Sequence, residues 1–165
     1  MKLFKKLNQT GVAHVAALAV VVVGLAAVGT YMLVQSHAAT CVDYQYGYGG
    51  SGTCVKYIQQ MLNGISHQYA GTTNSSGAVM TSSQLTVDGQ FGTATQSKVK
   101  TFQKWIFLTA DGVIGPKTWG NSAPTVMTYP SLCGYAHQSA FKNSTYAVER
   151  TAFQAASYAG CTNKI

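Results

Sequence analysis

Two acidic residues stand at matching places in a repeated motif and could do chemistry. Asp88 and Asp111 are each followed by glycine and, seven residues later, by threonine. Paired carboxylates near hydroxyl groups are compatible with metal binding or acid–base chemistry. Asp-Gly pairs, however, are most often found in tight turns, because glycine adopts the left-handed backbone conformation without strain. We therefore interpret both aspartates as turn residues.

A second pair of ionisable residues, His137 and Glu149, lies toward the C-terminal end of the chain. An imidazole and a carboxylate can act together in acid–base catalysis. The sequence around them supplies no further ionisable group that would complete a catalytic set. We expect both side chains on the surface and predict no catalytic residue.

Four cysteines form the remaining reactive set: Cys41, Cys54, Cys133 and Cys161. The absence of a Cys-x-x-Cys motif and of clustered histidines argues against zinc, so we predict no metal and no other cofactor. An even number of cysteines in an exported protein indicates disulfides. Four cysteines allow three pairings, of which Cys41–Cys54 and Cys133–Cys161 close the shortest loops and are favoured.

The N-terminal part of the chain predicts a membrane anchor. Residues 1–11 are basic, and residues 12–34 contain no Asp, Glu, Lys or Arg over a length sufficient to cross a bilayer. The three lysines of the first six residues place the N-terminus in the cytoplasm and the rest of the chain outside. Small residues at 36–38 leave a cleaved signal peptide, and hence secretion, as the alternative. The length of the apolar segment favours an uncleaved signal anchor.

The net charge of the chain is +7, from eleven Lys and Arg against four Asp and Glu. A basic surface favours anionic polymers as partners. The cations after residue 6 are scattered and accompany no nucleic-acid-binding motif, so we predict no nucleic-acid partner.

Beyond the anchor the sequence predicts a linker, a first helix and a long loop. Residues 35–53 are rich in Gly and Tyr and are interpreted as a linker. Apolar residues at helical spacing predict a helix over Val55–Leu62, which we expect Gly64 to end. The polar loop that follows extends to about Leu85 and is long for a compact domain.

The motif D-G-x-(F/I)-G-x-x-T occurs at 88–95 and again at 111–118. In each copy we expect a turn, an apolar residue directed inward, and a second glycine that introduces a helix, with Thr93 and Gln96 forming a capping box at the first helix. Val99, Phe102 and Ile106 then share the inward face of that helix. The residues assigned to this structural motif are Gly89, Gly92, Thr95, Phe102, Asp111, Gly112, Gly115, Thr118 and Trp119.

With this ordered series, residues 54–122 resemble the peptidoglycan-binding family 1 domain, a small three-helix module often attached to cell-wall hydrolases. The resemblance is carried by VKYIQQMLN at 55–63, LTVDGQFG at 85–92, Thr95, VKTFQK at 99–104, LTADGVIG at 108–115 and Thr118-Trp119. It implies an all-α domain that binds wall glycan or stem peptide and has no active site of its own. The tail, 123–165, is predicted to be helical and disulfide-linked, and it is too short for a separate catalytic domain.

The chain departs from the family pattern at two places that bear on binding. The loop before Leu85 is longer than the family usually carries, and Phe107 stands where the second helix commonly ends with glycine. The residues that we predict to contact the ligand are Asp88, Phe91, Lys104, Trp105 and Phe107. In the alternative interpretation, Trp105 and Phe107 pack against the longer loop or the tail.

These observations predict a non-catalytic, membrane-anchored, extracytoplasmic protein that binds bacterial peptidoglycan. The alternative is a surface protein-interaction subunit, which localises a separate wall hydrolase or acts as an adhesin. The partners expected from the first hypothesis are the glycan or stem peptide of the wall and, through residues 12–34, the membrane.

Overall fold

The computed structural model describes residues 40–120 and 130–161, and their regular secondary structure is helical throughout. The predicted basic N-terminus at 1–11 and the predicted membrane anchor at 12–34 lie outside these ranges. Within them, no helix is both long enough and apolar enough to cross a membrane. The all-α prediction is confirmed for the described part of the chain.

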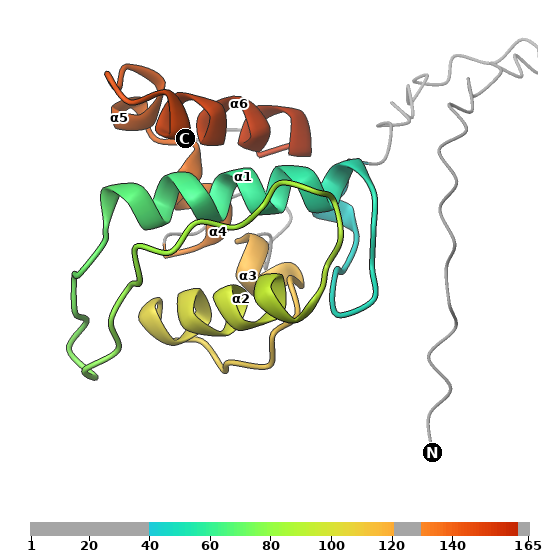
Figure 1. Ribbon diagram of the computed structural model, residues 1–165, viewed down its shortest axis with the longest axis horizontal. Helices are drawn as coiled ribbons and strands as arrows, with labels where there is room; N and C mark the ends of the chain where they lie inside the picture. The colour runs from blue at the N-terminus through green and yellow to red at the C-terminus, as the bar shows by residue number, and fades with distance from the viewer. Residues whose placement is uncertain (1–39, 121–129, 162–165) are drawn as a thin grey trace, which may run out of the picture. The chain divides into compact units, whose positions relative to one another are not determined.

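The helices follow one another from a short 3-10 turn to a C-terminal α-helix (Figure 1). Their bounds are Cys41–Asp43 (η1), Thr53–Gln68 (α1), Thr93–Trp105 (α2), Pro116–Trp119 (α3), Leu132–Ala136 (α4), Ser139–Lys142 (α5) and Ala147–Ala159 (α6). Isolated antiparallel bridges join Tyr46 to Ile114, Ser51 to Gln90, and Thr73 to Val79.

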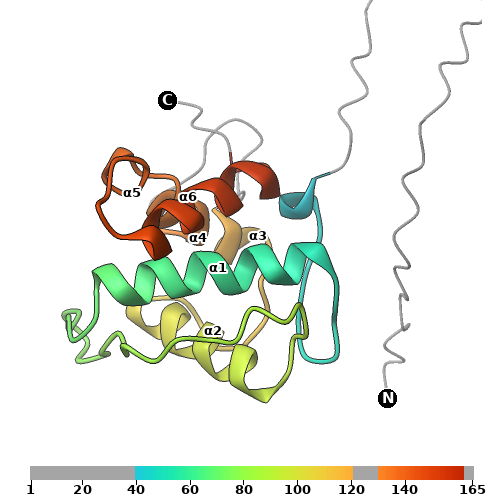
Figure 2. The same cartoon turned by 45° about the horizontal axis from the view of Figure 1, so that its top comes forward.

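Helix α1 is the centre of the arrangement, with α2 along one side and α6 along the other (Figures 1 and 2). Six large apolar side chains of α1 and the repeat are each at most 1% exposed: Ile58, Leu62, Phe91, Phe102, Ile114 and Trp119. Val99 and Ile106 are buried with them, so the predicted inward face of α2 is also confirmed. One continuous apolar core therefore joins the repeat to the central helix.

The first helix is longer than predicted, because Gly64 does not end it. Helix α1 continues to Gln68, and Gly64 lies where α6 crosses most closely. A Cβ atom at Gly64 would clash with Ala152 Cβ and would lie 3.2 Å from the carbonyl oxygen of Val148. Glycine is needed at this position for helix packing rather than for a turn.

The segment before α1 is not a linker over residues 40–53. Cys41 and Val42 are buried, and the Tyr46 and Ile114 backbones exchange hydrogen bonds of 3.0 and 2.8 Å. The Trp119 indole nitrogen donates to the carbonyl oxygen of Tyr44 at 3.0 Å. Residues 49–52 form backbone hydrogen bonds with the first copy of the repeat in the same way, so the segment packs onto both copies and belongs to the same compact unit as the helices.

The disulfides pair Cys41 with Cys54 and Cys133 with Cys161, the pairing that closes the shortest loops. The second bond ties α4 to the end of α6, which stops at Gly160 in the left-handed conformation. The capping box predicted at α2 is wrong: Gly92 is the N-cap residue and supplies no side-chain cap. Gly115 and Pro116 do begin α3 as expected.

The contact at Gly64 leads to a stability prediction. Gly64→Ala should lower the free energy of unfolding by about 1–3 kcal/mol through overpacking, although alanine gains about 1 kcal/mol in helix propensity. Ala152→Gly removes the opposing Cβ, so the double variant should be more stable than the sum of the single effects predicts. Chemical denaturation of all four proteins measures the coupling, and additive effects would contradict the close approach.

Candidate ligand-binding site

A buried glutamine organises the first Asp-Gly turn. The Gln59 amide nitrogen, on α1, donates to Asp88 Oδ1 at 2.8 Å, to the carbonyl oxygen of Gln90 at 3.1 Å and to Thr95 Oγ1 at 3.2 Å. Its amide oxygen accepts from the backbone nitrogen of Gly89 at 2.9 Å. Gln59 is 1% exposed, and its amide provides partners for the buried Gly89 N–H and the buried Thr95 hydroxyl.

The second turn repeats this arrangement around Gln103 of α2. Its amide nitrogen donates to Asp111 Oδ1 at 2.7 Å, to the carbonyl oxygen of Val113 at 2.9 Å and to Thr118 Oγ1 at 3.1 Å. Its amide oxygen accepts from the backbone nitrogen of Gly112 at 2.9 Å. We call each glutamine, together with the turn groups that it hydrogen-bonds, a glutamine clamp. Because both glutamines lie on the helix before their turn, the structural repeat begins upstream of the Asp-Gly motif.

The two clamp aspartates also accept hydrogen bonds from the backbone of their own turns. Each Oδ1 also accepts a backbone N–H two residues later, from Gln90 in the first copy and Val113 in the second. The hydrogen bond from Gln59, together with that from the Gln90 amide, lowers the pKa of Asp88 below its usual value. Both carboxylates thus shape their turns, as predicted for Asp88 and Asp111.

Sequence reasoning did not single out Gln59 and Gln103, although a signal for them was present. Each lies four residues after the valine of a Val-Lys pair, in the segments VKYIQQML and VKTFQKWI. The similarity of these segments extends the repeat upstream of the Asp-Gly motif. The second copy lies close to its turn in the sequence, whereas a long loop separates the first copy from its turn.

The five predicted ligand contacts do not form one site. Phe91 is 1% exposed and fills the core, so it is unavailable to a ligand. Trp105 is 8% exposed, and its ring lies 5.2 Å from that of Tyr69 and 4.9 Å from that of Tyr135. The prediction of both as contacts is wrong, because the longer loop and the tail cover Trp105. Lys104 and Phe107 remain exposed, close together on one hollow.

Phe107 occupies a backbone position that normally requires glycine. Helix α2 ends in a Schellman motif, in which the Leu108 amide donates to the Gln103 carbonyl at 2.8 Å and the Phe107 amide to the Lys104 carbonyl at 3.2 Å. Phe107 has a φ of 63°, in the left-handed region. For a residue with a Cβ this conformation costs roughly 1–2 kcal/mol. The ring is 59% exposed, so little burial offsets that cost.

The longer loop is fixed against the same helix end. The Asn74 amide nitrogen donates to the carbonyl oxygens of Lys104 and Trp105, both at 2.9 Å. Its oxygen accepts from the backbone amides of Ser76 and Ala78 and from the Ser76 hydroxyl, at 2.8–3.0 Å. One asparagine thus shapes the loop tip and attaches it to α2.

Between the loop tip and the helix end lies an open hollow of about 530 Å³, which we call the Phe107 hollow. Its lining residues are Ser76, Gly77, Ala78, Lys104, Phe107 and Leu108. It presents one aromatic face, one cation and one hydroxyl group, and no acidic residue contributes to it. A second hollow of about 430 Å³ lies beside the other clamp, where Asp111 and Lys117 line it.

The rest of the loop is held by two buried polar side chains. Asn63 of α1 accepts from the Leu85 amide at 2.7 Å and donates to its carbonyl at 2.9 Å. The Lys98 ammonium donates to the carbonyl and hydroxyl oxygens of Thr81, both at 3.0 Å, and to Ser83 Oγ at 3.2 Å. Burial lowers the pKa of Lys98 to about 8. These contacts give Lys98 a structural role.

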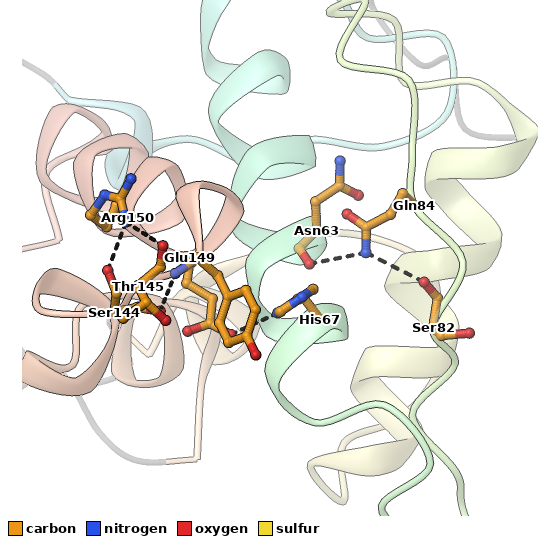
Figure 3. A network of polar contacts seen from close by, with 9 residues as sticks. Asn63, His67, Ser82, Gln84, Ser144, Thr145, Glu149 and Arg150 are labelled. Atoms are coloured by element: carbon orange, nitrogen blue, oxygen red, sulfur yellow. Dashed lines mark hydrogen bonds and ion pairs between the residues drawn. The ribbon is translucent and has the colours of Figure 1, made fainter.

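Glu149 is not a surface residue as predicted, and its partner is not His137. Its carboxylate is 3% exposed and lies 2.7 Å from His67 Nδ1 on α1 (Figure 3). The carboxylate is also in the first turn of α6, where a negative charge is favourable. His137 instead stacks on Phe153 with 4.5 Å between ring centroids. The His67–Glu149 pair joins the tail to the central helix.

All four acidic side chains of the chain are thus engaged in local or interhelical contacts, since Asp43 accepts from Thr40 at the start of η1. Among the described residues, no group of three His, Cys, Asp or Glu side chains could hold a metal ion. The described lysines have no carboxylate within ion-pair distance. Of these four carboxylates Glu149 is buried, whereas Asp43, Asp88 and Asp111 are exposed and accept hydrogen bonds within their own turns.

Comparison with known proteins identifies the segment that contains both clamps. Residues 51–120 match the family model described as a putative peptidoglycan binding domain. The chain is 35% identical over 92 residues to a zinc D-Ala-D-Ala carboxypeptidase of Streptomyces albus G, covering 51% of this chain and 31% of the enzyme. The match thus spans about a third of the length of that relative.

A crystal structure of a peptidoglycan-binding protein from Clostridioides difficile, in complex with glutamine hydroxamate, also shows similarity. The identity is 33%, the match covers 46% of this chain and 38% of the other, and the TM-score is 0.34.

The clamps predict a matched pair of stability effects. Gln59→Leu and Gln103→Leu should each lower the free energy of unfolding by about 1–3 kcal/mol, because both leave buried polar groups without partners. Gln60→Leu, at the neighbouring position of α1, should change it by less than about 0.5 kcal/mol. Denaturant titration measures all three, and equal stabilities at positions 59 and 60 would refute the structural importance of the clamp.

Proposed function

We propose that the chain is a non-catalytic cell-wall binding protein, because residues 51–120 match the family model of a putative peptidoglycan binding domain. The family match is the observation that carries the proposal. Both glutamine clamps lie within it, and they hold the turns that give the domain its core. The bacterial source of the similar carboxypeptidase agrees with a wall polymer as the partner.

The non-catalytic part of the proposal is supported by what the acidic groups do. Asp88 and Asp111 belong to the clamps, Asp43 belongs to the η1 turn, and Glu149 is buried against His67. A general acid or base must reach the atoms of its substrate. A carboxylate held in such contacts is better suited to stabilising the fold than to chemistry. The carboxypeptidase activity in the name of the Streptomyces relative is not proposed for this chain.

A second candidate function is that the chain localises a separate wall hydrolase. It is favoured by the match to about a third of the carboxypeptidase, since a similar segment there is part of a wall enzyme. In this hypothesis, binding to peptidoglycan and binding to the hydrolase would occur on different surfaces.

We further propose that the domain lies outside the cell, attached to the membrane by residues 12–34. The uncharged apolar run and the preceding lysines support this location, as do the two disulfides, which persist in oxidising compartments.

Binding to the wall is tested by co-sedimentation of the full chain, oxidised and solubilised in a mild detergent, with purified sacculi. We expect saturable sedimentation that persists at 0.5 M salt, a concentration on the order of that which screens simple charge attraction. An unrelated detergent-solubilised protein of similar net charge is the control. If no more of the chain than of the control protein sediments with sacculi, wall binding is refuted. If the chain then binds a wall hydrolase and not sacculi, the second candidate is favoured.

The location is tested by adding protease to intact cells stripped of their wall. Residues after 40 should be digested while a cytoplasmic marker protein survives. The mass of the protein from membranes then separates the two export routes, because a cleaved signal peptide would remove the first residues up to about Ala38. Protection of the C-terminal part would contradict export.

A further inference from the structure

We propose that the Phe107 hollow is the ligand site and that it binds an N-acetylated amino sugar bearing a carboxylate, the chemistry of muramic acid in the wall glycan. This inference rests on the proposed function and names the part of the polymer that this surface recognises. The hollow is formed by the tip of the long loop after α1 and by Phe107 at the end of α2.

The first argument is the conformation of Phe107. An exposed aromatic ring on a strained backbone contributes little to folding, and glycine would end α2 at this position without strain. Strain that the core does not require is a reason to look for function. One face of a pyranose ring is apolar, and it can cover an exposed aromatic ring in the way that other apolar groups do.

The second argument is the set of polar groups around the ring. Lys104 is exposed and, among the described residues, has no acidic partner, so its ammonium can bind the ligand's carboxylate. The Ser76 hydroxyl donates to Asn74, which leaves its oxygen free to accept from the N–H of an acetamido group. Aromatic face, cation and acceptor together match the three chemical features of the proposed sugar.

The third argument is the rigidity of the hollow. Asn74 donates hydrogen bonds to the carbonyl oxygens of Lys104 and Trp105. These bonds fix the loop tip, which forms one side of the hollow, to the end of α2, which forms the other. A preformed site loses less conformational entropy when it binds. The other hollow is a weaker candidate, because the exposed carboxylate of Asp111 lines it and would repel an anionic ligand.

The decisive variant is Phe107→Gly in the full chain. Glycine removes the ring and also relieves the left-handed strain, so the melting temperature should stay the same or rise by about 2–6 °C. Affinity for a GlcNAc–MurNAc disaccharide, measured by calorimetry, should fall by about tenfold or more. Phe107→Tyr should retain binding. A structural role for the ring would instead lower the melting temperature, and a Phe107→Gly variant that still binds would overturn the proposal.

The charge requirement is tested with Lys104→Gln and, as a matched control, Lys117→Gln at the other hollow. Only the first should weaken binding of the disaccharide, by about tenfold. Chitobiose lacks the carboxylate. Its affinity for wild type should therefore be about as low as the affinity of the disaccharide for the Lys104→Gln variant. If chitobiose and the disaccharide bind equally well, the proposal that the ligand carries a carboxylate is wrong. If a free stem peptide binds more tightly than the disaccharide, the ligand is the peptide and not the sugar.

These results separate the two proposals. If wild type binds sacculi and Phe107→Gly binds them equally well, the hollow is not the site and wall binding stands. If wild type does not bind sacculi, the proposed function itself fails.

Discussion

The fold depends on satisfying the polar groups of two tight turns that lie against an apolar core. Each turn places a glycine at a φ of 76° and directs its backbone N–H inward, where water cannot reach it. A glutamine from the preceding helix accepts that N–H and donates to three oxygens of the same turn. Because the amide carries a donor and an acceptor on one planar group, no apolar residue could replace it without leaving buried groups unsatisfied. The apolar residue after each turn can then enter the core.

The central helix extends this logic to the loop and the tail. Along one helix, Gln59 holds the first turn, Asn63 holds Leu85, Gly64 admits α6, and His67 meets Glu149. These four positions, each at most four residues from the next, thus contact segments that lie far away in the sequence. This arrangement explains why α1 extends past Gly64, where the sequence predicted its end: the last turn of α1 packs against the tail.

The sequence was informative where structure is determined locally. Helical spacing of apolar residues identified the core, and the Asp-Gly motif identified both turns. It failed where the deciding contact is distant. Gly64 has the form of a helix end, and only Ala152, 88 residues later, reveals that it is a packing position. Glu149 carries no local sign of burial, because its partner His67 is on another helix. Trp105 was misjudged for the same reason, since Tyr135 of the tail covers it.

Phe107 is the instructive exception, because comparison with the family pattern located it correctly. Its backbone takes the conformation of the glycine it replaces, and the Schellman hydrogen bonds of α2 are retained. The substitution therefore changes what the helix end displays without changing how the helix ends. The longer loop reaches the same carbonyl oxygens through Asn74, so both departures from the family pattern converge on one place. Because both clamp glutamines are buried, this helix end can vary its surface chemistry without changing the clamps, at a cost of roughly 1–2 kcal/mol for a residue with a Cβ at position 107. A binding specificity could therefore be altered here while the shared core is preserved.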